Sequence, residues 1–141
     1  MNDRHNLQRF IDAQEPVYTR VLTELRAGRK TSHWMWFVFP QIAGLGSSPI
    51  AQKFAIGSLE EASAYLAHAV LGPRLLECTG LVLQAEGAIG EILGYPDDLK
   101  FRSCMTLFAQ AAPSPAPFDD ALRKFFDGEP DPKTLERLGN R

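Results

Sequence analysis

The sequence predicts an all-α protein, folded as an irregular, compact, multihelical single domain of about eight short helices. Three observations predict this fold class. Apolar residues recur at helical spacing along most of the chain, residues that start or end helices flank these segments, and no two convincing strands are present to pair with each other. A length of 141 residues suits one domain with a real core. We therefore expect residues 1–141 to form one globular unit.

The first two helices are predicted before residue 28. Asn6 can cap a short helix that ends near Gln14, because three apolar residues follow it at helical spacing, namely Leu7, Phe10 and Ile11. Pro16 suits the first turn of a second helix, and Gly28 ends that helix.

Residues 30–41, which read KTSHWMWFVFPQ, hold both tryptophans of the chain. The apolar run from Trp34 to Phe39 has no clean period, so it is either a buried strand or a short helix buried on all sides. Aromatic residues favour a strand, but a lone strand would leave its backbone groups unpaired. We predict a helix that Ser32 caps and Pro40 ends. The main alternative is an α+β fold in which the run is the edge of a small sheet.

Capping residues divide the rest of the chain into short helices. Ser48-Pro49 begins one of them, and Ser58 with Glu61 forms a capping box for the next. The later helices are predicted over residues 73–86 (the longest), 88–93, 101–108, 118–126 and 134–138.

Composition excludes several functional classes. The formal net charge is −2, so we expect neither nucleic acid nor a membrane as a partner. Cys78 and Cys104 are isolated and have no histidine at metal-ligand spacing, which predicts buried free thiols and no metal site. No motif indicates a cofactor. The N-terminus lacks the apolar region of a secretory signal, and the longest apolar run is too short to cross a bilayer, so we expect a cytoplasmic protein.

Three segments resemble a known family. Residues 30–48 contain KTSHWMWFVFPQ followed by GLG and a serine, residues 61–75 contain EA, YL, a histidine and LGPRL, and residues 97–108 contain DDLK, a serine and MTLF. Over roughly residues 5–138 the chain resembles the bacterial domain-of-unknown-function family 1810. The resemblance implies a compact multihelical fold and no agreed activity.

Some members of that family are labelled calpastatin, and we do not transfer this label. Calpain inhibitors of that kind are disordered repeat proteins, whereas this chain has a core-forming composition. Phe54 and Cys104 stand where the family often has Tyr and Ser, so no hydroxyl function is expected at either position.

Polar residues at the two ends of the tryptophan run form a first candidate site. Lys30, His33 and Gln41 flank the run, and three loop residues follow, namely Gly44, Gly46 and Ser48. Glycines let backbone N–H groups converge, and a helix start adds partial positive charge, so this loop is a reasonable cradle for an anion or a phosphate. The alternative is that the glycines make a tight turn and the serine only caps a helix.

Three further groups are candidates. His33 or His68 could act as a general acid or base, oriented or ionised by Asp98, although His68 could equally cap a helix end and Asp98 a helix start. Lys100 and Ser103 share a helix face with Thr106 and either line a pocket or bond back to the helix.

The tryptophans are the last candidates. Trp36 could stack on an aromatic ligand, although such residues more often belong to the core.

The leading hypothesis is a small domain that binds a phosphate-bearing or nucleotide-like ligand. Its site would comprise Lys30, Trp36, Gln41, Gly44, Gly46, Ser48, Lys100 and Ser103. The second hypothesis is an enzyme that acts on such a ligand through His33, His68 and Asp98, and the third is a helical module that binds an unknown protein partner. The first two require these segments to converge on one concave pocket.

Overall fold

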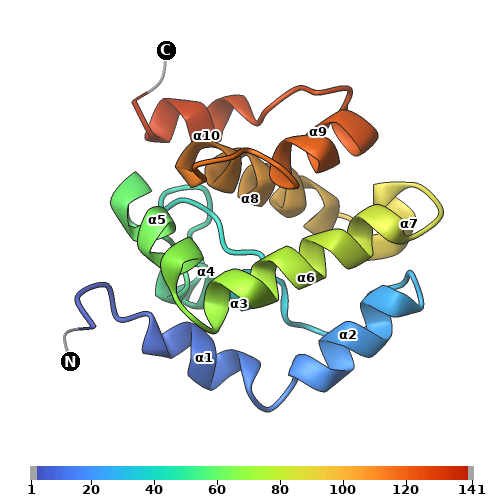
Figure 1. The fold of residues 1–141 in the computed structure, drawn as a ribbon, viewed down its shortest axis with the longest axis horizontal. Helices are drawn as coiled ribbons and strands as arrows, with labels where there is room; N and C mark the ends of the chain where they lie inside the picture. The colour runs from blue at the N-terminus through green and yellow to red at the C-terminus, as the bar shows by residue number, and fades with distance from the viewer. Residues whose placement is uncertain (1–2, 140–141) are drawn as a thin grey trace.

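Ten helices account for the regular structure of residues 3–139, which are the residues that the computed structural model describes (Figure 1). The all-α prediction is confirmed, and each of the ten helices overlaps a segment predicted to be helical, although the predicted total was about eight. They are α1 (Gln8–Gln14), α2 (Tyr18–Arg26), α3 (Met35–Val38), α4 (Pro49–Lys53), α5 (Leu59–Ala67), α6 (Leu71–Gln84), α7 (Ile89–Leu93), α8 (Asp97–Ala111), α9 (Phe118–Phe126) and α10 (Pro132–Arg137).

Helix α8 organises the packing. It contacts α5, α7, α9 and α10, while α6 packs against α2, α5 and α9. Figure 1 shows α9 and α10 on one side of α8, α1 and α2 on the far side of the molecule, and α6 crossing between them. With 15 residues α8 is the longest helix, so the prediction that the 73–86 segment would be longest is wrong.

The tryptophan run lies at the centre of the core. Its helix α3 is a single turn of four residues, which overturns the strand alternative. Trp34 and Phe39 are fully buried, and the ring of Phe39 meets that of Phe101 edge-on, with centroids 5.1 Å apart. Because so short a helix leaves carbonyl groups unpaired, the buried Gln14 Nε2 donates a 2.6 Å hydrogen bond to the Phe37 carbonyl oxygen.

The carboxylate of Glu24, at the end of α2, holds the chain just before this run. It accepts hydrogen bonds from Thr31 N (2.8 Å), Ser32 N (3.1 Å), Ser32 Oγ (2.5 Å) and Trp34 Nε1 (3.0 Å). Ser32 therefore donates to Glu24 and does not cap α3. No side chain caps the start of α3, so the prediction of a Ser32 cap is wrong. Burial raises the pKa of Glu24, but the hydrogen bonds outweigh burial and lower the pKa from its ordinary value of 4.5 to about 2.

The loop after the run closes on itself. Ile56 N donates to the Gln41 carbonyl oxygen (2.8 Å) and Ala43 N donates to the Ile56 carbonyl oxygen (2.8 Å), which makes a single parallel bridge between Ile42 and Ile56. This bridge is the only β pairing within residues 3–139. It holds α4 inside a closed loop beside α3, and Arg9 fastens the end of this loop through Lys53 and Ala55 carbonyl oxygens.

The predicted serine caps of α4 and α5 are observed, whereas the predicted Asn6 cap of α1 is wrong, because Leu7 N (2.7 Å) and Gln8 N (3.0 Å) donate to the Asp3 carboxylate instead. Ser48 accepts from Ala51 N at the start of α4, and Ser58 accepts from Glu61 N at the start of α5. The Glu61 carboxylate does not complete a capping box, because it accepts from Gly57 N and pairs with Arg9 instead, at 2.9 Å in each case.

Two features that the sequence argues against, a membrane-spanning segment and a metal site, can be compared with the structure. No single helix within residues 3–139 is long and apolar enough to span a membrane, and α5 with α6, which would pass together by length and composition, are bent by 90° at the break between them. The same residues contain no group of three or more His, Cys, Asp or Glu side chains that could hold a metal ion.

The Glu24 hydrogen bonds predict a pH-dependent loss of stability. A depressed pKa stabilises the fold above the unfolded value of 4.5, and this stabilisation is lost as the pH falls towards about 2. Glu24→Gln should therefore lower the free energy of unfolding by roughly 3 kcal/mol at pH 7, since the shift is about 2.5 pKa units. The difference from the wild type should shrink between pH 4.5 and pH 2 in urea unfolding curves. Glu86→Gln, at an exposed glutamate, is the control, and an equal loss there would contradict the assignment.

Two glycines of α6 should respond oppositely to alanine. A Cβ at Gly72 would overlap the backbone oxygen of Leu66 in α5, whereas a Cβ at Gly80 would meet nothing within 4 Å. Gly72→Ala should therefore cost more than roughly 2 kcal/mol by forcing α5 and α6 apart. Gly80→Ala should stabilise the protein by roughly 0.5–1 kcal/mol through helix propensity. Thermal unfolding of both variants checks this, and destabilisation by Gly80→Ala would show that α6 is packed more closely there.

Candidate functional site

A carboxylate from α8 brings two lysines to the two tryptophans. Asp97 Oδ2 lies 2.7 Å from Lys30 Nζ, and Asp97 Oδ1 lies 3.3 Å from Lys100 Nζ. The Lys30 ammonium lies 5.2 Å from the ring centroid of Trp34, and the Lys100 ammonium lies 4.5 Å from that of Trp36. Lys30, Trp36 and Lys100 were all predicted site residues, and the structure groups them. Asp97 was not among the predicted site residues, whereas the neighbouring Asp98 was.

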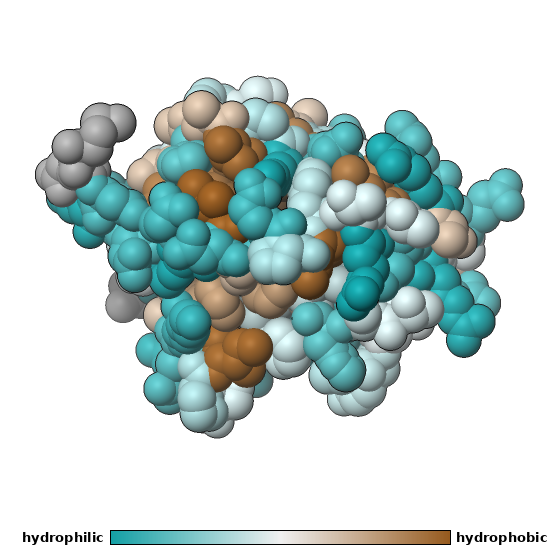
Figure 2. All heavy atoms as spheres, turned by 90° about the horizontal axis from the view of Figure 1, so that it is seen from below, coloured by the Kyte–Doolittle hydropathy of each residue, from teal (hydrophilic) through white to brown (hydrophobic). Residues whose placement is uncertain are grey.

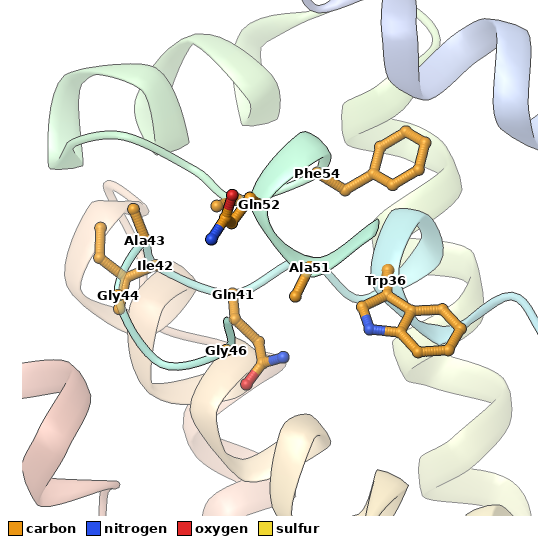
Figure 3. A pocket seen from close by; sticks show the side chains of 10 residues that line it. Trp36, Gln41, Ile42, Ala43, Gly44, Gly46, Ala51, Gln52 and Phe54 are labelled. Atoms are coloured by element: carbon orange, nitrogen blue, oxygen red, sulfur yellow. The ribbon is translucent and has the colours of Figure 1, made fainter. Parts of the chain in front are cut away.

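A pocket of about 130 Å³ opens beside this group (Figure 3). Four predicted ligand residues line it, namely Trp36, Gln41, Gly44 and Gly46. The other wall is contributed by α4 and the residues around the Ile42–Ile56 bridge: Ile42, Ala43, Ala51, Gln52, Phe54 and Ala55. The closed loop thus places Trp36 and the residues that follow the tryptophan run at one hollow, whereas Lys30 and His33, before the run, do not line it.

Several polar groups at the pocket have no partner within residues 3–139. These are the Gln41 carboxamide, the indole N–H of Trp36, and the backbone N–H groups of Gly44 and Gly46. Figure 3 shows the indole nitrogen of Trp36 on the side of the ring that faces Ala51 and Gln41. The pocket therefore presents hydrogen-bonding groups that a ligand can use.

Arg137 is a further cation that sequence reasoning missed. It lies at the end of α10, and its Nη2 donates a 3.1 Å hydrogen bond to the carbonyl oxygen of Gly44. Gly44 has φ of +99°, and a Cβ there would overlap the guanidinium, so only glycine lets the arginine lie so close. No local signal marks Arg137, because its partner is 93 residues away in the sequence.

Two predicted ligand residues have structural partners instead. Ser48 caps α4 and is not part of the pocket wall. Ser103 Oγ donates to Asp131 Oδ2 (2.9 Å) and to the Leu99 carbonyl oxygen (3.2 Å), and Thr106 Oγ1 accepts from Asp131 N (2.8 Å). The alternative of bonding back to the helix is therefore observed at Ser103, and the same hydroxyl docks the start of α10.

The predicted acid–base residues do not form a pair. His33 is exposed and makes no hydrogen bond to the described part of the chain. His68 Nδ1 accepts from Val70 N (3.1 Å) and Leu71 N (3.3 Å), so it caps the start of α6. Asp98 Oδ1 accepts from Leu99 N (2.9 Å). No hydrogen bond or ion pair joins a histidine to a carboxylate anywhere in residues 3–139.

The cysteines are free and buried, as predicted. Burial raises the pKa of Cys78 to about 12 and raises that of Cys104 well above its ordinary value. Both thiols are therefore neutral at physiological pH, which makes them poor nucleophiles.

The fold and the site define a small all-helical domain with one uncharged pocket flanked by cations. The family described as "Protein of unknown function (DUF1810)" matches residues 4–138, and this chain belongs to it. Among solved structures, the chain is similar to the conserved hypothetical protein Rv1873 from Mycobacterium tuberculosis. The two are 56% identical, the match covers 99% of this chain and 100% of that one, and the TM-score is 0.96. No curated protein matches the chain.

Asp97 and Asp98 should differ sharply when replaced by asparagine. Asp97→Asn leaves two mostly buried lysines without their shared carboxylate and should cost roughly 2–4 kcal/mol of unfolding free energy. Asp98→Asn is the matched control and should change stability by less than about 0.5 kcal/mol, because the side chain bonds only its neighbour's N–H. Urea unfolding at low and high salt measures both. Equal effects would mean that the lysine pair does not depend on Asp97.

Proposed function

We propose that the protein binds a small anionic ligand, phosphate-bearing or nucleotide-like, in the pocket beside Trp36. One observation carries the proposal: Trp36 of the tryptophan run and Gln41 and Gly44, which follow the run, line one hollow that lies against cations. The ligand hypothesis asks for several segments at one pocket, and the wall comes from residues 36–55 alone, with Lys100 of α8 against the ring of Trp36.

The charges around the pocket favour an anion. Lys30 and Lys100 share the single carboxylate of Asp97, so this group carries one excess positive charge. Arg137, at the Gly44 end, adds another, and no carboxylate within residues 3–139 pairs with it. Near a protein surface, a unit charge about 4 Å from an opposite charge gains about 4 kcal/mol. Binding of an anion should accordingly weaken as salt concentration rises.

The two other hypotheses have less support. An acid–base enzyme needs a histidine held by a carboxylate, and no such pair is formed in the described residues. An interaction module needs a contiguous exposed apolar patch. On the face seen in Figure 2, apolar residues lie in separate small groups among hydrophilic ones. The large exposed apolar side chains are spread over four helices and two loops: Ile50, Leu59, Val70, Leu76, Tyr95 and Leu99.

A thermal-shift screen of nucleotides and sugar phosphates tests the proposal. At a concentration of ten times the Kd, a ligand adds about 1.4 kcal/mol, which corresponds to a rise in Tm of roughly 3–8 °C for a domain of this size. Lys100→Gln should reduce this shift, because it removes the ammonium that lies over Trp36. His33→Ala is the control and should keep the full shift, since His33 lies outside the pocket.

Two outcomes would count against the proposal. One is that no anionic compound raises the Tm of the wild-type protein. The other is that the shift persists fully in Lys100→Gln and disappears in His33→Ala, which would move the site to His33.

A further inference from the structure

We infer that the pocket receives an uncharged, planar, hydrogen-bonding ring and that the ligand's anionic group stays outside, at the flanking cations. The ligand is then a nucleoside phosphate, in which a ring of this kind is linked to phosphate, and not a sugar phosphate or inorganic phosphate. This inference rests on the proposed function and specifies its ligand.

The first argument is the absence of charge in the pocket wall. None of its ten residues has an ionisable side chain. An anion inside the hollow would lose water without gaining a counter-charge, which is costly. The cations lie at the rim: Lys100 against the ring of Trp36 and Arg137 against Gly44.

The second argument is the kind of polar group that the wall presents. A carboxamide offers donors and an acceptor in one plane, and an indole N–H is a donor only. The Gln41 carboxamide and the Trp36 indole N–H both lack partners within residues 3–139, and both lie at the pocket (Figure 3). Glutamine reads nucleobase edges through such in-plane donor and acceptor pairs. Ile42, Ala51 and Phe54 add apolar surface suited to the faces of a ring.

The third argument is size. The pocket has a volume of about 130 Å³. This is well below the roughly 300–1,000 Å³ of pockets that enclose a drug-sized ligand. One substituted ring can enter, and the sugar and phosphate of a nucleotide must then remain at the mouth.

The fourth argument is the position of the cations relative to the mouth. Figure 3 places Trp36 and Gly44 at opposite ends of the pocket. Arg137 makes a single hydrogen bond to the described residues, through Nη2, and thus keeps most of its five N–H donors for another group. A guanidinium fork suits phosphate oxygens. A phosphate that projects from the pocket at the Gly44 end would therefore meet Arg137.

Isothermal titration tests this inference with defined probes. The probes are the four ribonucleoside 5′-monophosphates, the corresponding nucleosides, ribose 5-phosphate and inorganic phosphate. At least one nucleotide should bind roughly tenfold more tightly than ribose 5-phosphate, since the ring adds hydrogen bonds to the half-buried Gln41 and Trp36 side chains. The corresponding nucleoside should compete with that nucleotide for the site.

Variants then separate the ring from the phosphate. Gln41→Leu should weaken the nucleotide roughly tenfold and leave ribose 5-phosphate unchanged, whereas Arg137→Gln should weaken both. Gln84→Leu, at an exposed glutamine outside the pocket, is the matched control and should change neither. Gln41→Glu keeps the side-chain shape and should weaken the nucleotide even if the leucine variant folds poorly.

The failures are distinguishable. If no phosphate compound binds, the proposed function falls and this inference falls with it. If ribose 5-phosphate or inorganic phosphate binds as tightly as every nucleotide, or if nucleosides do not compete, the proposed function stands and the inference is overturned. Equal weakening of both ligand types by Gln41→Leu would also overturn it.

Discussion

The buried carboxylate of Glu24 is the interaction on which the rest of the structure depends. Its hydrogen bonds to residues 31–34 turn the chain after α2 back towards the core and fix the indole of Trp34 inside it. Once Trp34 is anchored, the single turn of α3 carries Trp36 to the edge of the core, where its ring is half-buried and lines the pocket. The position of Trp36 at the pocket therefore depends on the anchoring of Trp34 in the core.

Asp97 links this anchored segment to the central helix α8. It pairs with Lys30, far before α8 in the sequence, and with Lys100, within α8. Each ammonium lies over the ring of one tryptophan. One carboxylate cancels only one of the two positive charges that it holds. The ion pairs that stabilise the fold therefore leave a net positive charge beside the pocket. The same ion pairs therefore serve both stability and the proposed recognition of an anion.

Local signals in the sequence predicted much of the fold but chose the wrong partners at the site. Ser48 and Ser58 mark helix starts by rules that need only neighbouring residues, and the structure confirms both. By contrast, Asp97 and Asp98 both lie in the first turn of α8, and the ion pairs that distinguish Asp97 include one to Lys30, which is far away in the sequence. Arg137 has no local signal at all, because its contact with Gly44 arises from the docking of α10.

The shape of the pocket and its charge have different structural origins. The shape comes from the loop closed by the Ile42–Ile56 bridge, which contains α4 with its own cap and which Arg9 of α1 fastens. The charge comes from residues that the loop does not contain: Lys100 of α8 and Arg137 of α10. Neither cation is part of the wall itself, although Arg137 bonds to Gly44 and Lys100 lies against Trp36. Affinity for the anionic part of a ligand therefore depends on side chains outside the wall, whereas affinity for the part that enters the pocket depends on the wall itself.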